Sequence, residues 1–183
     1  GDLQDALFQA AERIRGFHER QPIPNWTTTE MGGVLGQRFT AIRRVGVYVP
    51  GGTAPLPSSL LMTAIPAQIA GVPEIIIATP PGRPHGQISD VILAAAAVAG
   101  IRTVYAVGGA LAVAAMTFGT ETIPRVDKIV GPGNLFTTLA KQQVYGIVGI
   151  DGLYGPSETA VVADYSADPA WVAADMLAQA EPD

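Results

Sequence analysis

The sequence predicts an α/β fold in which a parallel sheet carries helices on both faces. From residue 45 onward, short segments rich in β-branched residues alternate with longer Ala-rich segments. The strand candidates are apolar throughout, which is typical of parallel strands buried on both faces. Because helices separate these strands, we expect right-handed crossovers that cover the sheet on both sides.

Composition narrows the class of protein further. The chain has 183 residues, of which 48% are hydrophobic and 15% charged, a size that suits one domain with an appendage. No apolar segment is long enough to span a bilayer, and a net charge of -5 provides no basic stripe, so we expect neither a membrane nor a nucleic-acid partner. The absence of Cys excludes disulfides and thiolate metal sites and favours a cytoplasmic protein.

The first 44 residues read as an N-terminal helix followed by an irregular arm. Apolar residues recur at helical spacing between residues 2 and 19, with Asp2 and Asp5 near the start. The stretch QPIPNWTTTEMGGVLGQRF contains two Pro and three Gly and has no sustained period. It predicts an irregular connection or a short hairpin.

Residues 45 to 150 contain the regular alternation of strand and helix candidates. We expect strands at 45–49, 74–79, 103–107 and 127–130. Helices are expected at 58–71, 86–99, 110–118 and 134–145. Each helix candidate is entered or left through Gly or Pro, as expected for turns between elements.

Residues 151 to 183 contain one further strand candidate and one further helix candidate. A loop, DGLYGPSE, precedes a strand candidate at 159–165 and a helix candidate from Asp168 to about Gln179. The final helix candidate ends at AEPD without a Gly cap or a polar tail, which favours a cut through a larger protein.

Three Gly-rich segments follow predicted strands: VPGGTAPLPSS, VGGALAV and VGPGN. Because parallel strands end at the same edge of a sheet, we expect these loops to converge and bind a ligand. Two residues there have alternative roles. Tyr48 could face a cofactor or fill the core, and Asn134 could contact a ribose or amide group or simply cap the following helix.

Other polar candidates are less informative. Ser157 and Glu158 could position a substrate or belong to a Pro-containing turn, and no His or Asp is placed to make Ser157 a triad nucleophile. The histidines, His18 and His85, have no partner at metal-ligand spacing, so neither is assigned to chemistry.

The segments RRVGVYVPGGTAPLPSSLLMTAIPAQIAGV, YAVGGA, FGTETIPRVDKIVGPGN, GPSE and AQAE together resemble histidinol dehydrogenases in order and spacing. The resemblance implies oxidation of L-histidinol to L-histidine in two NAD-dependent steps, the last of histidine biosynthesis, by homodimers with zinc at the substrate. The implied architecture is a pair of incomplete Rossmann-like units related to aldehyde dehydrogenases, one inserted into the other. Residues 45–150 would be the inserted, NAD-binding unit, and residues 151–183 would start the return into the neighbouring domain. The flanking elements, which lack their usual cover, should expose apolar surface.

By this resemblance, Tyr48 and Asn134 match NAD-contacting positions, Ser157 matches a substrate-contacting position, and Gln179 matches a zinc ligand at the substrate. No catalytic residue is assigned, because the acid-base Glu-His pair of the family lies beyond residue 183. One zinc ligand cannot hold the metal, since catalytic zinc sites use about three protein ligands.

Two positions depart from the family pattern. Leu111 stands where the family has a Gln that touches NAD, and Pro182 stands where it has a His that binds zinc. We therefore expect a histidinol dehydrogenase fragment limited to cofactor binding. The alternative is a non-catalytic domain, engineered or relic, in which Leu111 adds packing and Pro182 ends a truncated helix.

Overall fold

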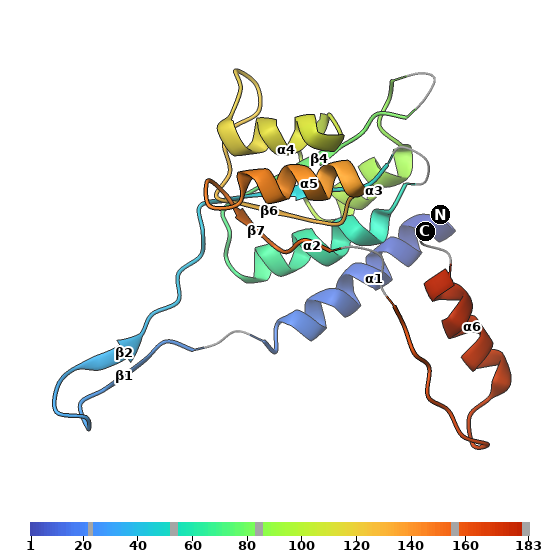
Figure 1. Ribbon diagram of the computed structural model, residues 1–183, viewed down its shortest axis with the longest axis horizontal. Coiled ribbons are helices and arrows are strands. Elements are labelled where there is room, and N and C mark those ends of the chain that lie inside the picture. The colour runs from blue at the N-terminus through green and yellow to red at the C-terminus, as the bar shows by residue number, and fades with distance from the viewer. Residues whose placement is uncertain (22–23, 52–54, 83–85, 155–157, 181–183) are drawn as a thin grey trace. The chain divides into compact units, whose positions relative to one another are not determined.

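The computed structural model describes residues 1–21, 24–51, 55–82, 86–154 and 158–180. The chain divides into two compact units, Gly1–Leu153 and Tyr154–Asp183. The first unit contains the sheet and is the larger of the two (Figure 1).

A parallel sheet forms the centre of the first unit. Within the described residues it has five strands in the order β5-β4-β3-β6-β7. The strands are β3 Arg44–Tyr48, β4 Glu74–Thr79, β5 Val104–Ala106, β6 Lys128–Val130 and β7 Gly149–Ile150. The α/β class is confirmed, and the four strands predicted between residues 45 and 130 lie within one residue of their predicted ends at either side.

The chain winds outward from β3 in two directions. It first passes through α2 (Pro57–Ile69) and α3 (Asp90–Val98) to build β4 and β5 on one side of β3. It then crosses back through α4 (Gly109–Phe118) to β6 and continues through α5 (Leu135–Val144) to β7. The strand order therefore reverses between β3 and β6, a switch point of the kind where doubly wound sheets bind ligands.

Each face of the sheet buries its own core. Strand β3 is apolar on both sides, with Val45 and Val47 packed in the core that α2 and α3 cover, and Tyr48 in the core that α4 and α5 cover. Full burial of one such aliphatic side chain stabilises the fold by roughly 1.5 to 3 kcal/mol. This two-sided burial explains why the strands lack polar alternation in the sequence.

The N-terminal helix α1 (Asp2–His18) packs beside α2 and α3, and Figure 1 shows it alongside α2. It buries Leu7 and Ala11, and Arg15 Nη2 donates to Gln68 Oε1 of α2 over 3.0 Å. The following arm contains an antiparallel hairpin of β1 (Trp26–Thr28) and β2 (Leu35–Gln37). The predicted helix is confirmed, and of the two options for the arm the structure has the hairpin.

Two predicted elements differ in the structure. Helix α3 begins at Asp90 rather than residue 86, because the positive φ of Gly86, +68°, is incompatible with a right-handed helix and the Gln87 carbonyl accepts from the Gly82 N–H. The predicted strand at 159–165 is wrong, since the structure has no strand among described residues 158–180. A β-branched run such as VV becomes a strand only when a neighbour accepts its backbone hydrogen bonds.

The second unit contains helix α6 (Pro169–Ala180), whose start fits the predicted helix. Asp168 caps it, with its carboxylate oxygen accepting from the Ala170 N–H over 2.8 Å. Across the described parts of both units, no helix has the length and apolar character that a bilayer span requires.

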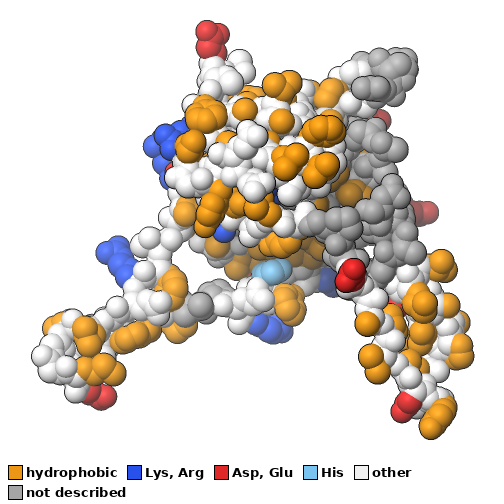
Figure 2. Space-filling view, viewed as in Figure 1, with side chains coloured by type: hydrophobic (Ala, Val, Ile, Leu, Met, Phe, Trp, Pro, Cys, Tyr) orange, Lys and Arg blue, Asp and Glu red, His pale blue; other side chains and the backbone are white. Residues whose placement is uncertain are grey.

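The outer surfaces of α4 and α5 carry many apolar side chains (Figure 2). The exposed ones are Leu111, Phe118, Leu135, Phe136, Leu139 and Tyr145.

Candidate functional site

The loops that follow β3, β5 and β6 meet at the carboxyl edge of the sheet. Tyr48, the last residue of β3, is only 4% exposed, and its ring lies in the core beneath α4 and α5. Its hydroxyl oxygen accepts a hydrogen bond from the Gly109 N–H over 3.0 Å. Gly109 is the first residue of α4, the helix that follows β5. Tyr48 therefore connects the end of β3 to the turn after β5, which lies two positions away in the sheet.

The segments at the carboxyl edge of the sheet approach one another closely at three glycines, Gly51, Gly108 and Gly131. Gly131, directly after β6, has a φ of +115°, and a Cβ atom there would overlap the carbonyl oxygen of Tyr48. A Cβ on Gly108 would lie 2.5 Å from Pro80, and one on Gly51 would lie 2.5 Å from the Thr79 hydroxyl. The described parts of the three glycine turns therefore lie at one edge of the sheet, as predicted, whereas residues 52–54 of the first turn lie outside the described residues. At each of these three glycines a side chain would collide with a neighbouring segment.

Asn134 is the N-cap of α5. Its side-chain oxygen accepts from the Thr137 backbone N–H over 3.1 Å and from the Thr137 hydroxyl over 3.2 Å. The residue is exposed at the rim of the loop edge. The capping role, left open by the sequence, is thus observed, and its exposure leaves room for the predicted contact with a cofactor.

An ion pair beneath the loop after β6 was missed by the sequence analysis. Lys141 of α5 is 3% exposed, and its Nζ lies 2.7 Å from Asp151 Oδ1 and 2.5 Å from the Gly131 carbonyl oxygen. Asp151 Oδ2 accepts from the Gly131 N–H over 2.7 Å. The spacing of Thr137, Lys141 and Val144, all buried, could have placed the lysine on the inner face of α5.

The other predicted site residues are either exposed or lie outside the part of the chain that the structure describes. Leu111 lies in the first turns of α4 and is 75% exposed, and Glu158 is exposed. Ser157, Pro182 and His85 lie outside the described residues, and so does the side chain of Gln179 in α6. Among the residues that the structure describes, no group of three or more His, Asp or Glu could hold a metal ion.

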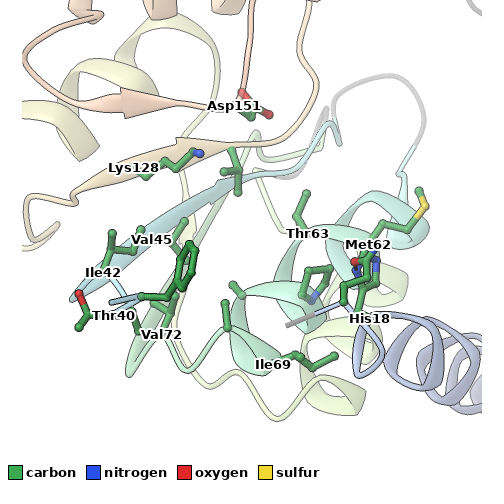
Figure 3. A pocket seen from close by; sticks show the side chains of 17 residues that line it. His18, Thr40, Ile42, Val45, Met62, Thr63, Ile69, Val72, Lys128 and Asp151 are labelled. Atoms are coloured by element: carbon green, nitrogen blue, oxygen red, sulfur yellow. Dashed lines mark hydrogen bonds between the residues drawn. The ribbon is translucent and has the colours of Figure 1, made fainter. Parts of the chain in front are cut away.

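A separate groove lies on the other face of the sheet (Figure 3). It has a volume of about 750 Å³ and a mainly apolar lining from α2, the arm at 39–42 and strands β3 and β6. Lys128 and Asp151 lie on the side opposite His18. Neither Tyr48 nor Asn134 contributes to it, but Asp151, which accepts from the Gly131 N–H, also lines the groove.

Fold and site together define a doubly wound α/β domain of the class that binds ligands at the carboxyl edge of its sheet. The family model described as histidinol dehydrogenase matches residues 1–183. The chain belongs to the histidinol dehydrogenase family.

Relatives of known name support this assignment. The chain is 54% identical over 183 residues to histidinol dehydrogenase from Chromobacterium violaceum, covering 100% of this chain and 42% of that protein. It is 52% identical over 181 residues to the enzyme from Pseudomonas savastanoi pv. phaseolicola, covering 98% and 40% respectively. The crystal structure of histidinol dehydrogenase from Elizabethkingia anophelis matches with a TM-score of 0.93 at 44% identity, covering 100% of this chain and 42% of that one.

The chain thus spans about two fifths of the length of the relatives it matches, with coverages of 40% and 42%. It is a fragment relative to those proteins. The high TM-score over the whole chain means that the sheet and its helices have the same arrangement as the corresponding part of a histidinol dehydrogenase.

Proposed function

We propose that this chain forms the part of an NAD-dependent histidinol dehydrogenase that binds the dinucleotide. The observation that carries this proposal is the contact of Tyr48, at the end of β3 beside the switch point, with the glycine turns that follow β5 and β6. Tyr48 and Asn134 are the proposed contacts with NAD, from the end of β3 and the start of α5.

The electrostatics of this edge suit a dinucleotide. Helices α4 and α5 both begin there, at Gly109 and Leu135, and helix N-termini direct unpaired backbone N–H groups and a partial positive charge toward anions. A pyrophosphate is such an anion. When bound, NAD would accept a hydride from the substrate, while the chain's own residues bind and orient it.

Binding of the substrate, binding of zinc and oligomerisation are proposed for the complete enzyme rather than for this chain alone. Ser157 and Gln179 would contact L-histidinol, and Gln179 would be one of the zinc ligands. Pro182 stands at a second ligand position of the family and cannot bind zinc, and the other ligands and the acid-base pair would lie outside these 183 residues. Turnover of histidinol by this chain alone is therefore not expected. A cytoplasmic homo-oligomer remains our proposal for the complete protein.

The domain boundaries follow from the same reading. We propose that residues 45–150 are the inserted Rossmann-like unit and that residues 1–44 and 151–183 belong to the neighbouring domain. In support, all five strands of the described sheet lie between Arg44 and Ile150.

Isothermal titration calorimetry of the purified chain with NAD tests the proposed function. We expect saturable binding at one site, with zinc and histidinol titrated separately as controls. The Asn134→Ser variant sharpens the test, because Ser keeps the helix cap but removes the amide group. Weaker NAD binding with an unchanged melting temperature would support the contact, while no heat of binding with the unsubstituted chain would refute the proposed function.

A further inference from the structure

We infer that Lys141 and Asp151 are positioning residues for the cofactor loop: their ion pair fixes the backbone of Gly131 in the geometry that NAD binding requires. This inference rests on the proposed NAD site. Neither side chain is placed in contact with NAD, so both would act through Gly131.

The three residues form a closed ring of polar contacts. Asp151 Oδ2 accepts from the Gly131 N–H over 2.7 Å, and Lys141 Nζ donates to the Gly131 carbonyl over 2.5 Å. The ring closes through the 2.7 Å contact between Lys141 Nζ and Asp151 Oδ1. Both backbone polar groups of one loop residue are therefore held by charged partners, which make shorter and stronger hydrogen bonds than neutral ones.

Burial explains why this ring must be complete. The Lys141 side chain is 4% exposed and that of Asp151 is 21% exposed, so water cannot readily replace a lost partner of the lysine. Burying a charge is costly unless it is paired and hydrogen-bonded. Burying Lys141 and Asp151 therefore costs desolvation free energy that a pair of apolar side chains in the same space would avoid.

Gly131 is the residue through which the ring would reach the cofactor site. Its φ of +115° is a conformation that other residues rarely adopt, and its backbone lies against the backbone of Tyr48. Three residues further on, Asn134 begins α5. A shift of Gly131 would therefore move both proposed NAD contacts relative to each other.

Asp151 also fixes the point where the chain leaves the sheet. It directly follows β7, and its Oδ1 accepts from the Gly152 N–H over 2.9 Å. The carboxylate thus connects the ends of β6 and β7, two neighbouring strands, at the carboxyl edge of the sheet. A carboxylate can accept from all these donors at once, whereas an amide cannot, because its nitrogen is a donor.

The test compares NAD affinity with stability in three variants of the 183-residue chain: Asp151→Asn, Lys141→Met and the double variant Lys141→Met/Asp151→Leu. We expect each to raise the Kd for NAD about tenfold or more, measured well below its melting temperature. The double variant removes the lone buried charge, so its melting temperature should recover relative to Lys141→Met while its Kd stays high.

The matched control is Glu74→Gln, which breaks the 2.5 Å ion pair between Arg44 and Glu74 at the opposite, amino-terminal edge of the sheet. Its Kd should stay within about twofold of the original, because this pair lies at the start of β3 and β4, at the end of the strands away from the proposed NAD site. Unchanged NAD affinity in folded Asp151→Asn and Lys141→Met would overturn the inference and leave the proposed function intact.

A second readout separates failure of the inference from failure of the proposed function. If the unsubstituted chain does not bind NAD, the proposed function fails, and amide hydrogen exchange at Gly131 then tests the ring alone. Faster exchange of this amide in Asp151→Asn than in Glu74→Gln would support fixation of the loop by the ion pair. Equal protection in the two variants would overturn it.

Discussion

The hydroxyl oxygen of Tyr48 accepts a hydrogen bond from the backbone N–H of Gly109 at 3.0 Å, while the ring of Tyr48 is buried among the side chains of the sheet and α4. Gly109 is an N-terminal residue of α4, whose N–H has no partner within the helix. The Tyr48 side chain, at the end of β3 and next to the proposed cofactor position, thus supplies the acceptor for the first N–H group of α4.

The substitution Tyr48→Phe should destabilise the chain by about 1 kcal/mol, because it leaves the Gly109 N–H without its acceptor while keeping the ring. Urea unfolding would measure the loss. Tyr105→Phe is the matched control, since the Tyr105 hydroxyl donates to the Thr122 carbonyl over 2.9 Å at an exposed position and should cost about 0.5 kcal/mol or less. Equal losses in the two variants would contradict the buried role of the Tyr48 hydroxyl.

The substitution Gly131→Ala should be far more damaging than Gly100→Ala. Both glycines have positive φ, +115° and +69°, so alanine is strained at either position, by about 1 to 2 kcal/mol in the left-handed region that Gly100 occupies. Only at Gly131 would the added Cβ also overlap the backbone of Tyr48, whereas nothing lies within 4 Å at Gly100. Circular dichroism melts should show an intact Gly100→Ala and a Gly131→Ala that is severely destabilised; similar melting temperatures would show that the loop can move away from β3.

Stability should fall slightly as the pH drops below about 5, in part through the Arg44–Glu74 pair. The hydrogen bond from Arg44 holds the pKa of Glu74 below its ordinary value, which the unfolded chain retains at about 4.3. A folded-state pKa below the unfolded value stabilises the fold above that pH, and this contribution disappears as the pH falls through the folded pKa.

Because the two side chains are 17% and 41% exposed, water screens the pair and its contribution at pH 7 should be about 1 kcal/mol or less. The Glu74→Gln variant should therefore be slightly less stable at pH 7 and lose less stability between about pH 5 and 3. Urea midpoints at several pH values would measure both effects. Parallel pH profiles for the two proteins would count against a lowered pKa of Glu74.

The sequence predicted the elements that depend on local patterns, namely the apolar strands and the glycine turns that follow them. Apolar runs such as EIIIAT at Glu74–Thr79 and the glycine turns that follow the strands are local patterns, and the structure places them as expected. The strand at 159–165 was wrong because pairing depends on a neighbour that no local pattern encodes. The contact between Lys141 and Asp151 was missed for a similar reason: the two residues come from a helix and a strand end that only the tertiary fold brings together.

The substitution Leu111→Gln should leave stability within about 0.5 kcal/mol of the original. Leu111 is 75% exposed in α4, so its side chain buries little surface, and Leu and Gln have similar helix propensities. This exposure weighs against the interpretation in which Leu111 was acquired for packing.

If position 111 contacts NAD as the family resemblance implies, the same variant should bind NAD more tightly, because Gln restores a hydrogen-bonding group at the start of α4. Thermal melts and calorimetric titrations of the two proteins would measure both quantities, with Leu93→Gln in α3, 42% exposed on the other face of the sheet, as the control. A melting temperature clearly lowered by Leu111→Gln would restore the packing reading, and an unchanged NAD affinity would remove position 111 from the proposed contacts.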